Sequence, residues 1–375
     1  MTQYRYVDSA AALADVVASY RVEPLVAADT EAASYHRYVD RVYLVQLSTR
    51  RATAVIDPLA LRDLAPLGAL LADTKIEKVF HDADYDLRNL DRDYGFRPRR
   101  LFDTRIAAQL VGEPSIGLAA LLEKYVGVRL VKAHQRADWS VRPLPPAMLA
   151  YAADDTRHLP ALRDAMRQRL QALGRLAWAE EEFLGLEQRR WSAPTEVGQA
   201  YLRIKGAKAL PPRQLATLRE LVAWRDALAA EQDKAAFRII GNEALLAVSQ
   251  ALPPTLDALS GIGGLPASLA RRHGPALVAA VGRALALADR DLPKREHAPR
   301  APKDVELEAR VERLKVARNQ VAQQLGLDPG VLCGKATLEQ VARLRPRDRA
   351  GLSLVNELRK WQIDVLGDAL LQALS

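Results

Sequence analysis

The chain has 375 residues, of which 54 are Lys or Arg and 46 are Asp or Glu, and its hydrophobic fraction is 49%. That length suggests two or three domains, and that composition excludes a mainly disordered chain. The single cysteine, Cys333, excludes a disulfide scaffold and a cysteine-rich zinc module. The N-terminus lacks a signal-peptide pattern and no apolar run is long enough to span a membrane, so we expect a cytoplasmic protein.

The positive charge is unevenly divided along the chain. Residues 1–200 carry 27 basic and 27 acidic side chains, whereas residues 201–375 carry 27 basic and 19 acidic ones, which accounts for the whole net charge of +8. Residues 201–300 alone hold a net charge of +6. A basic second half indicates either a polyanion-binding domain or a solvated basic surface, and charge alone does not separate the two.

The first half alternates strand-like and helix-like segments. Segments rich in Val, Leu and Ile predict strands over residues 21–30, 43–48, 53–57 and 78–81. Apolar residues at helical spacing predict helices over residues 59–72, 84–94, 118–126 and 146–173. This alternation predicts an α/β sheet domain over residues 1–190.

The second half is predicted to be helical and contains an internal repeat. Residues 221–253 align without gaps with residues 314–346, at a constant offset of 93. Each copy has the pattern of two helices joined by a bent connection that contains a glycine. We therefore expect two small helical domains, over residues 210–288 and 306–375, joined by a polar, proline-containing linker over residues 289–305.

Carboxylates occur at places where a fold can bring them together. Asp29 and Glu31 close a predicted strand, and residues i and i+2 of a strand share one side. Asp86 is one of three acids at the start of a predicted helix, and position alone does not choose it over its neighbours. Tyr151 and Asp155 are four residues apart on another predicted helix. Taken singly, they are as well explained as solvated charges, a helix-start acid and a packed tyrosine. Together they predict a site for hard divalent cations, which prefer oxygen ligands.

Three segments resemble the motifs of the DEDDy 3′–5′ exonucleases. They are AADTEAASYHRYVDRVYLVQLS with Asp29 and Glu31, VFHDADYDL with Asp86, and YAADDTRHL with Tyr151 and Asp155. The segments LFDTRIAAQL and DWSVRPLP are similar to those of the ribonuclease D branch, and the two C-terminal repeats are similar to HRDC domains. The resemblance implies an α/β RNase H-like exonuclease domain, a mixed sheet flanked by helices, followed by two small all-α HRDC-like domains.

The resemblance also implies an activity and a set of roles. It implies a metal-dependent 3′–5′ exoribonuclease that trims the 3′ ends of tRNA precursors and other structured RNAs and releases 5′-mononucleotides. Asp29, Glu31, Asp86 and Asp155 would hold two divalent cations, Mg²⁺ or Mn²⁺, and Tyr151 would position the attacking water. The middle motif is unusually acidic, so Asp82 and Asp84 remain alternative ligands. The partner would be RNA, and a monomer is favoured.

Four further residues are weaker candidates for substrate binding. His81 follows a predicted buried strand and would face the scissile nucleotide, or be a hydrogen-bonded, half-buried histidine. Gln46 would contact the terminal sugar or satisfy backbone groups. Trp139 would stack on a base or cover the domain edge, and Arg142 would bind phosphate or pair with a local acid.

Other functions are less favoured by the sequence. A DNA exonuclease would use the same motifs, but no polymerase or helicase module accompanies them. A non-catalytic nucleic-acid-binding protein with HRDC-like modules is disfavoured because all the expected acids are present. The segment Gly261–Gly264 lacks the context of a phosphate-binding loop, and no Walker sequence occurs, so no nucleotide cofactor is expected.

Overall fold

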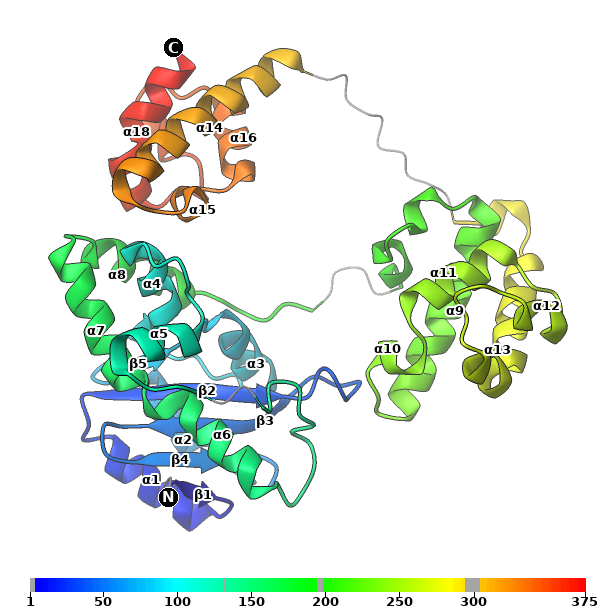
Figure 1. Cartoon of the computed structure of the whole chain (residues 1–375), viewed down its shortest axis with the longest axis horizontal. Coiled ribbons are helices and arrows are strands. Elements are labelled where there is room, and N and C mark those ends of the chain that lie inside the picture. The colour runs from blue at the N-terminus through cyan, green and yellow to red at the C-terminus, as the bar shows by residue number, and fades with distance from the viewer. Residues whose placement is uncertain (1–3, 131–132, 194–197, 294–303) are drawn as a thin grey trace. The chain divides into compact units, whose positions relative to one another are not determined.

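The computed structural model describes residues 4–130, 133–193, 198–293 and 304–375. Within these residues, one sheet contains the strands β1 Arg5–Val7, β2 Leu25–Ala32, β3 Val42–Ser48, β4 Thr53–Ile56, β5 Glu77–Phe80 and β6 Leu101–Asp103. Their order is β1-β4-β3-β2-β5-β6 (Figure 1). The pairs β2–β3 and β3–β4 are antiparallel, and the pairs β1–β4, β2–β5 and β5–β6 are parallel. The predicted mixed sheet is thus confirmed.

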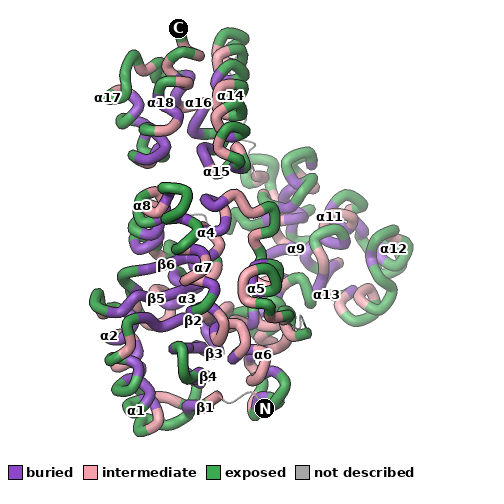
Figure 2. Tube along the Cα trace, turned by 60° about the vertical axis from the view of Figure 1, so that its left-hand side comes forward, coloured by how far each residue is buried: buried purple, intermediate pink, exposed green. Residues whose placement is uncertain are grey.

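The sequence pattern predicts four of these strands and misses the two at the edges. β1 and β6 have three residues each, too short for a period of two to stand out. The central strands β2 to β5 are almost wholly buried, as Figure 2 shows. Accordingly, β3 and β4 have nearly continuous apolar sequences rather than alternating ones.

Eight helices in the described part of the first half accompany the sheet. They are α1 Ala10–Tyr20, α2 Ala65–Ala72, α3 Asp84–Tyr94, α4 Thr104–Val111, α5 Leu118–Val126, α6 Pro146–Arg157, α7 Leu159–Ala172 and α8 Leu176–Leu186. The helix predicted over residues 146–173 is divided at His158, because Pro160 has no backbone N–H to continue the ladder. Among the described residues, no helix is both long and apolar enough to cross a membrane.

A second unit contains residues 33–41 together with residues 192–300. Its helices are α9 Pro212–Glu231, α10 Ala236–Ile239, α11 Asn242–Ala251, α12 Leu256–Ser260 and α13 Ala267–Leu285. They enclose a core of their own, in which Leu221, Leu245 and Leu277 have no exposed surface. Residues 294–303 of the predicted linker lie outside the described residues.

The C-terminal helices repeat this arrangement at the offset found in the sequence. They are α14 Val305–Leu325, α15 Pro329–Leu332, α16 Lys335–Leu344, α17 Arg349–Leu352 and α18 Lys360–Leu374. α10 and α15 begin and end 93 residues apart, as do α11 and α16. Leu252 and Arg345, one repeat apart, both end their helix in the left-handed region. The repeat predicted from sequence is therefore a structural repeat.

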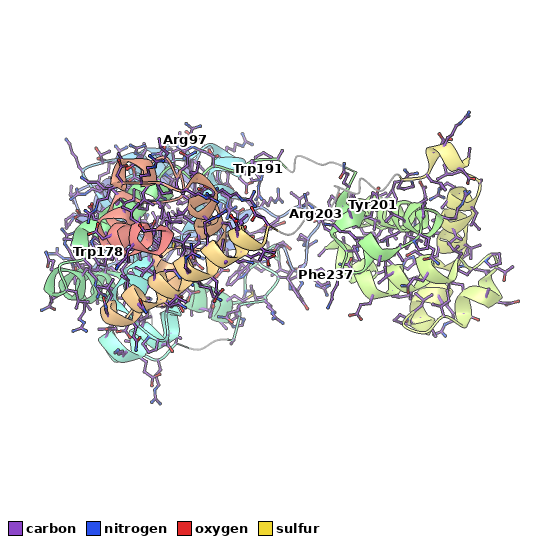
Figure 3. The ribbon with its side chains drawn as sticks, turned by 90° about the horizontal axis from the view of Figure 1, so that it is seen from above. Arg97, Trp178, Trp191, Tyr201, Arg203 and Phe237 are labelled. Atoms are coloured by element: carbon purple, nitrogen blue, oxygen red, sulfur yellow. The ribbon has the colours of Figure 1, made fainter. Side chains whose placement is uncertain are left out.

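The C-terminal helical domain packs against the end of the α/β domain. The ring of Trp361 stacks on that of Trp178 in α8, with centroids 4.9 Å apart; Figure 3 labels Trp178. The Glu181 carboxylate accepts hydrogen bonds from the backbone N–H groups of Lys360 and Trp361, at 2.6 and 3.0 Å, and so satisfies free donors at the start of α18. These contacts join the two domains into one unit.

Candidate active site

Three carboxylates from two elements meet at one end of the sheet. Asp29 and Glu31 lie two residues apart on β2, and Asp155 lies on α6, which packs beside β2 and β3 (Figure 1). Each offers a carboxylate oxygen, and these oxygens all lie within 4.8 Å of one another. The packing of α6 on the sheet is fixed by a hydrogen bond of 2.7 Å between the hydroxyls of Thr156 and Ser48. We call Asp29, Glu31 and Asp155 the carboxylate cluster.

Asp86 reaches the same region from the first turn of α3. Its carboxylate accepts hydrogen bonds from the backbone N–H of Thr30, at 3.1 Å, and from the Thr30 hydroxyl. Thr30 lies between Asp29 and Glu31, so Asp86 is tied to the strand that carries them. Asp86 is buried, and its charge interacts with that of Asp29. The structure therefore brings Asp29, Glu31 and Asp155 together and places Asp86 next to them through Thr30, outside the group whose oxygens lie within 4.8 Å of one another.

The other acids of the middle motif have different partners. Asp82 is exposed and forms an ion pair with Arg105. Asp84 forms ion pairs with Arg88 and, at 3.1 Å, with Arg189. These pairings leave Asp86 as the acid of this motif whose charge interacts with those of Asp29 and Glu31.

The electrostatics of the cluster favour the binding of a cation. Burial, together with the charge of Asp155, raises the pKa of Asp29 to about 8. Burial and the neighbouring carboxylates also hold the pKa of Glu31 and that of Asp86 well above their usual values. Like charges in a buried site repel each other unless a cation lies between them. Oxygen ligands at this spacing fit hard divalent cations such as Mg²⁺.

Tyr151 and Asp155 share one face of α6, as their spacing predicts. The two side chains border the same pocket, and the charge of Asp155 acts on the Tyr151 hydroxyl. Burial, and then the charges of Asp155, Glu31 and Asp29, raise the pKa of Tyr151, so this phenol is protonated at neutral pH. The hydroxyl therefore remains a hydrogen-bond donor beside the carboxylates.

Trp139 supports Tyr151 and is not available to a base. Its side chain is 1% exposed, and its ring centroid lies 6.2 Å from that of Tyr151. A buried indole has no free face on which a nucleobase could stack. The structure thus favours the packing role for Trp139 over the base-stacking role.

Arg142 forms an ion pair inside the protein. Its guanidinium donates to both carboxylate oxygens of Asp57, at 2.6 and 2.9 Å, and to the carbonyls of Trp139 and Tyr43. Asp57 is buried at the end of β4. This fork pairing occupies the donors that a phosphate would need, so the structure favours the alternative in which Arg142 pairs with a local acid.

Gln46 lies directly beside the carboxylates. It is paired with Asp29 across the β2–β3 ladder, and paired residues of neighbouring strands point to the same face. Gln46 has no exposed surface, and neither atom of its amide has a hydrogen-bond partner within the part of the chain that the structure describes. A buried amide without partners is rare, and it indicates that a further polar group completes this site.

His81 borders a pocket of about 310 Å³ that also contains Asp29, Tyr151 and Asp155. The opposite wall comes from residues 117–120, at the start of α5. The His81 ring contacts the Thr104 hydroxyl through Nδ1, at 2.9 Å. The prediction that His81 faces the reacting groups stays a prediction, and this geometry is compatible with it.

Asp103 is a supporting residue that the sequence patterns did not single out. Its carboxylate accepts hydrogen bonds from the backbone N–H groups of Arg105 and Ile106, which begin α4. It also accepts from the backbone N–H of Ala83, at 2.7 Å, and so holds the turn that leads into α3 and Asp86. An aspartate just before a helix is a signal for an N-cap, but its second contact is formed only in the folded chain.

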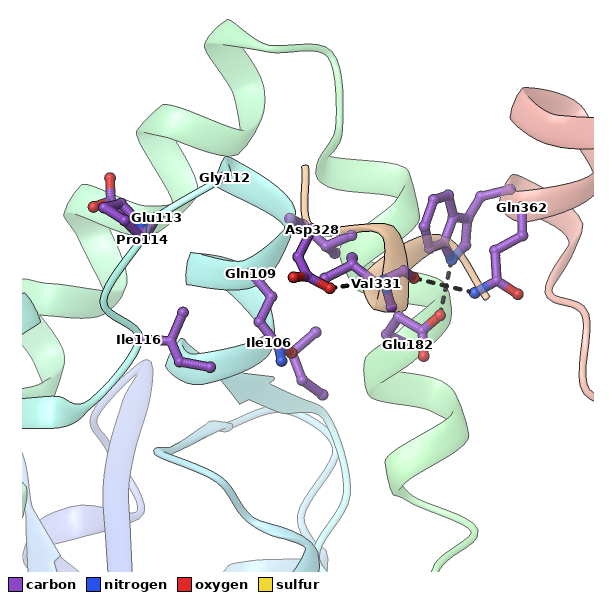
Figure 4. Close-up of a pocket in the computed structure, with 13 residues that line it drawn as sticks. Ile106, Gln109, Gly112, Glu113, Pro114, Ile116, Glu182, Asp328, Val331 and Gln362 are labelled. Carbon is purple, nitrogen blue, oxygen red and sulfur yellow. Dashed lines mark hydrogen bonds between the residues drawn. The ribbon is translucent and has the colours of Figure 1, made fainter. Parts of the chain in front are cut away.

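A larger cavity of about 670 Å³ lies away from the carboxylates. Figure 4 shows it between α4, α8 and the C-terminal helical domain, with Gln109, Glu182 and Asp328 among its lining residues. The Trp361 indole N–H donates to the Glu182 carboxylate at its border, at 2.8 Å. The cavity belongs to the junction of the two domains and contains none of the predicted site residues.

Family models and relatives agree on the class of this fold and site. A 3′–5′ exonuclease model matches residues 4–171, and an HRDC domain model matches residues 214–281 and 308–374. Ribonuclease D of Gluconacetobacter diazotrophicus is 33% identical, over 95% of this chain and 89% of its own length. Ribonuclease D of Pseudomonas paraeruginosa is 31% identical, over 99% and 98% of the two chains.

Solved structures agree with these relatives. Escherichia coli RNase D, an exoribonuclease involved in structured RNA processing, aligns with a TM-score of 0.71 and 29% identity over 100% of this chain and 99% of its own. The catalytic core of RRP6 from Trypanosoma brucei aligns with a TM-score of 0.68 and 29% identity, over 76% of this chain and 81% of its own. The fold and the site thus define a 3′–5′ exonuclease with two HRDC domains. The chain belongs to the ribonuclease D family of 3′–5′ exoribonucleases.

Proposed function

We propose that this exoribonuclease trims the 3′ ends of tRNA precursors and other structured RNAs by two-metal hydrolysis and releases 5′-mononucleotides. The observation that carries the proposal is the convergence of Asp29, Glu31 and Asp155, with Asp86 tied to the same strand. The relation to a family member that processes structured RNA supports the choice of substrate. The finer assignment to tRNA precursors rests on the family resemblance.

The four carboxylates are the proposed metal ligands. Mg²⁺ or Mn²⁺, when bound, would stabilise the charge that develops on the attacking and leaving oxygens. Asp29, Glu31 and Asp155 supply oxygens at mutual distances that suit such ions, and Asp86 adds a fourth carboxylate. The unpartnered amide of Gln46 supports the view that this region holds a further polar group.

Tyr151 is the proposed residue that positions the attacking water. Its raised pKa keeps the phenol protonated, so its hydroxyl can donate one hydrogen bond to a carboxylate and accept another from a water. His81 and Gln46 remain candidates for contact with the bound nucleotide. For Trp139 and Arg142 we propose supporting roles, because one packs on Tyr151 and the other is paired with Asp57.

We propose that the chain is divided into an exonuclease domain over residues 1–190, a first HRDC-like domain over 210–288, a linker over 289–305 and a second HRDC-like domain over 306–375. Helices α9 to α13 and α14 to α18 correspond to the two helical ranges, with α14 beginning one residue earlier. A cytoplasmic location and a monomeric state stay predictions from the sequence.

The first helical domain is the proposed RNA-holding surface. It lies in the part of the chain with a net charge of +6. Phe237 is about half exposed, its ring centroid lies 5.0 Å from that of Tyr35, and the Arg238 guanidinium lies 6.0 Å from the Tyr35 ring (Figure 3). Exposed aromatic rings combined with positive charge are typical of single-strand binding. In the second helical domain, the start of α18 is used in packing on α8.

The substrate is tested by a time course on 3′-extended tRNA and on matched single-stranded DNA, with and without Mg²⁺. Release of mononucleotides from the RNA, dependent on the metal, is the expected result. Faster hydrolysis of the DNA would favour a DNA exonuclease, and oligonucleotide products would indicate an endonuclease.

The site is tested by Asp29→Asn, with Asp82→Asn as the matched control. Loss of one charged cluster oxygen should lower nucleotide release at least about a hundredfold while RNA binding survives. Asp82 belongs to the same acidic motif but is paired with Arg105 outside the cluster, so Asp82→Asn should retain activity. Unchanged Mg²⁺-dependent release by Asp29→Asn would contradict the metal assignment.

A further inference from the structure

The imidazole of His81 presents one nitrogen to the protein and the other to the pocket. Nδ1 lies 2.9 Å from the Thr104 hydroxyl oxygen. Nε2 has no hydrogen-bond partner among the described residues. Because it is also absent from the fully buried polar atoms that lack a partner, Nε2 has some exposed surface. Because the ring borders the pocket that contains Asp29 and Tyr151, Nε2 is open to whatever fills that pocket.

The hydrogen bonds of Thr104 determine which nitrogen carries the proton. The Thr104 hydroxyl donates its single hydrogen to the carbonyl oxygen of Phe80, at 3.0 Å. With that hydrogen directed to Phe80, the hydroxyl oxygen accepts from the N–H at Nδ1. This arrangement satisfies both groups at once, so we assign the proton to Nδ1. In the neutral ring, Nε2 then carries a lone pair and is a hydrogen-bond acceptor.

The ring is neutral at physiological pH. Burial lowers the pKa of His81 to about 4, and this effect outweighs the charge of the nearby Asp82. Thr104 has no exposed surface, so its hydrogen bond to Nδ1 is shielded from water. At neutral pH the pocket therefore has a fixed acceptor at Nε2, in addition to the anionic oxygens of its carboxylates.

A neutral hydrogen-bond acceptor at Nε2 requires a donor on the substrate, such as a hydroxyl group. The pocket borders the cluster at which the scissile phosphate would bind, so it suits the ribose of the terminal nucleotide. Base amino groups occur on only some nucleotides, whereas the ribose hydroxyls occur on every RNA end. Resting on the function proposed above, we propose that His81 Nε2 accepts a hydrogen bond from a hydroxyl of the terminal ribose. The 2′-hydroxyl would give selectivity for RNA, and the 3′-hydroxyl would give recognition of a free end.

The test combines variants of His81 with substrates that lack one hydroxyl. RNAs ending in an ordinary, a 2′-deoxy or a 3′-deoxy nucleotide are compared by kcat/KM on wild type, His81→Asn and His81→Gln. The Asn side chain can still reach Thr104 but not the position of Nε2, whereas Gln extends to that position. For one of the two deoxy ends, the kcat/KM of wild type should be about tenfold lower than for the ordinary end. In His81→Asn, kcat/KM should be the same for that end and the ordinary one. His81→Gln should restore part of the difference.

A matched pair at Thr104 tests the tautomer. Thr104→Val removes the hydroxyl that holds the proton on Nδ1 and should reduce the same preference, whereas Thr104→Ser keeps the hydroxyl and should retain it. Thermal unfolding of each variant identifies any that does not fold.

Binding of the products gives a readout that does not depend on activity. Dissociation constants of AMP, 2′-deoxy-AMP and 3′-deoxy-AMP for wild type and His81→Asn, measured by calorimetry with Mg²⁺ present, should show the same coupling. Equal losses by His81→Asn on all three ligands and substrates would overturn the assignment. If wild type releases no nucleotide from RNA but the binding coupling is found, the proposed function fails and the His81 assignment stands.

Discussion

Gln46 stands opposite Asp29 in the β2–β3 ladder, fully buried and with neither atom of its amide hydrogen-bonded within the described residues. An amide in this state lowers the stability of the folded chain, since it has left water without gaining a partner. Its position beside a cluster of carboxylates suggests a reason for this cost, and we expect the partner to be a group that enters with the proposed metal ions or substrate. The first prediction follows from this pairing.

Replacing Gln46 by Met should stabilise the metal-free protein and weaken its activity. Loss of an unsatisfied amide should raise the free energy of unfolding by about 1–3 kcal/mol. If the amide orders groups around the metal ions, nucleotide release should fall by about 10- to 100-fold. Urea unfolding in EDTA and steady-state kinetics measure the two effects. A variant that is less stable and fully active would show that the amide serves only the fold.

The carboxylate cluster should make the metal-free protein less stable as the pH rises. The folded-state pKa values of Asp29, Glu31, Asp86 and Asp155 lie above the unfolded value of about 4. The folded chain therefore binds more protons than the unfolded chain in this window, and the free energy of unfolding falls from about pH 4 toward pH 8. Each such group contributes up to about 1.4 kcal/mol per pH unit.

Urea unfolding from pH 5 to pH 8.5 in EDTA measures this slope. Asp29→Asn should reduce it, and excess Mg²⁺ should flatten it, because the cation replaces the protons. Asp82→Asn is the control, since Asp82 lies outside the cluster. A slope that Mg²⁺ leaves unchanged would contradict metal binding by these acids.

Tyr151→Phe should separate catalysis from metal binding. The four carboxylates remain, so stabilisation by Mg²⁺ in a thermal shift should persist. The hydroxyl beside Asp155 is removed, and kcat should fall by about a hundredfold if the phenol positions the attacking water. The Phe ring keeps the packing on Trp139, which makes this a conservative change. An unaltered kcat would remove Tyr151 from the mechanism.

Arg142→Gln should destabilise the fold through Asp57. Burial raises the pKa of Asp57, but hydrogen bonds from Arg142 and Tyr6 outweigh that effect and hold it below its usual value. The variant leaves a buried carboxylate without its cation, which should cost about 3 kcal/mol at pH 7.

The pH dependence gives the sign of this contribution. Because the folded-state pKa of Asp57 is depressed, the stabilisation is present above the unfolded value of about 4 and disappears as the pH falls through the folded value. Wild type and Arg142→Gln should therefore begin to converge in stability below about pH 4 and become equal only below the folded-state pKa of Asp57. A variant of unchanged stability but weaker RNA affinity would instead assign Arg142 to phosphate binding.

Exposed arginines of α13 should account for part of the salt dependence of RNA binding. Arg271 and Arg272 are exposed, and neither has an ion pair within the described part of the chain. The double change to Gln should weaken binding and reduce the slope of log K against log salt by about 0.7 for each phosphate that is no longer neutralised. Arg283→Gln is the matched control, because Arg283 is already paired with Glu220, at 3.1 Å. Fluorescence anisotropy across a range of KCl concentrations measures the slopes. Equal slopes in the double variant and wild type would show that Arg271 and Arg272 do not contact the RNA phosphates.

Local sequence patterns were sufficient for the elements that carry the site. The i, i+2 spacing of Asp29 and Glu31 on a strand and the i, i+4 spacing of Tyr151 and Asp155 on a helix are properties of the backbone geometry of those elements. The offset of 93 residues likewise predicted two helical domains, because the second copy reproduces the helices of the first. That these acids share one cation site was predicted from their places in the expected elements, and the family resemblance then selected Asp86 among its neighbours and assigned the roles.

Tertiary structure decided which side chains are available to a substrate. The sequence of the segment that contains Trp139 and Arg142 is compatible with RNA binding as well as with a supporting role. The contacts of Trp139 with Tyr151 and of Arg142 with Asp57 favour the supporting role. The tautomer of His81 depends on Thr104, which is 23 residues away along the chain. Such contacts join residues distant in sequence, and neither periodicity nor spacing encodes them. The sequence by itself thus determined which chemical groups this enzyme has, and the folded chain determined which of them meet.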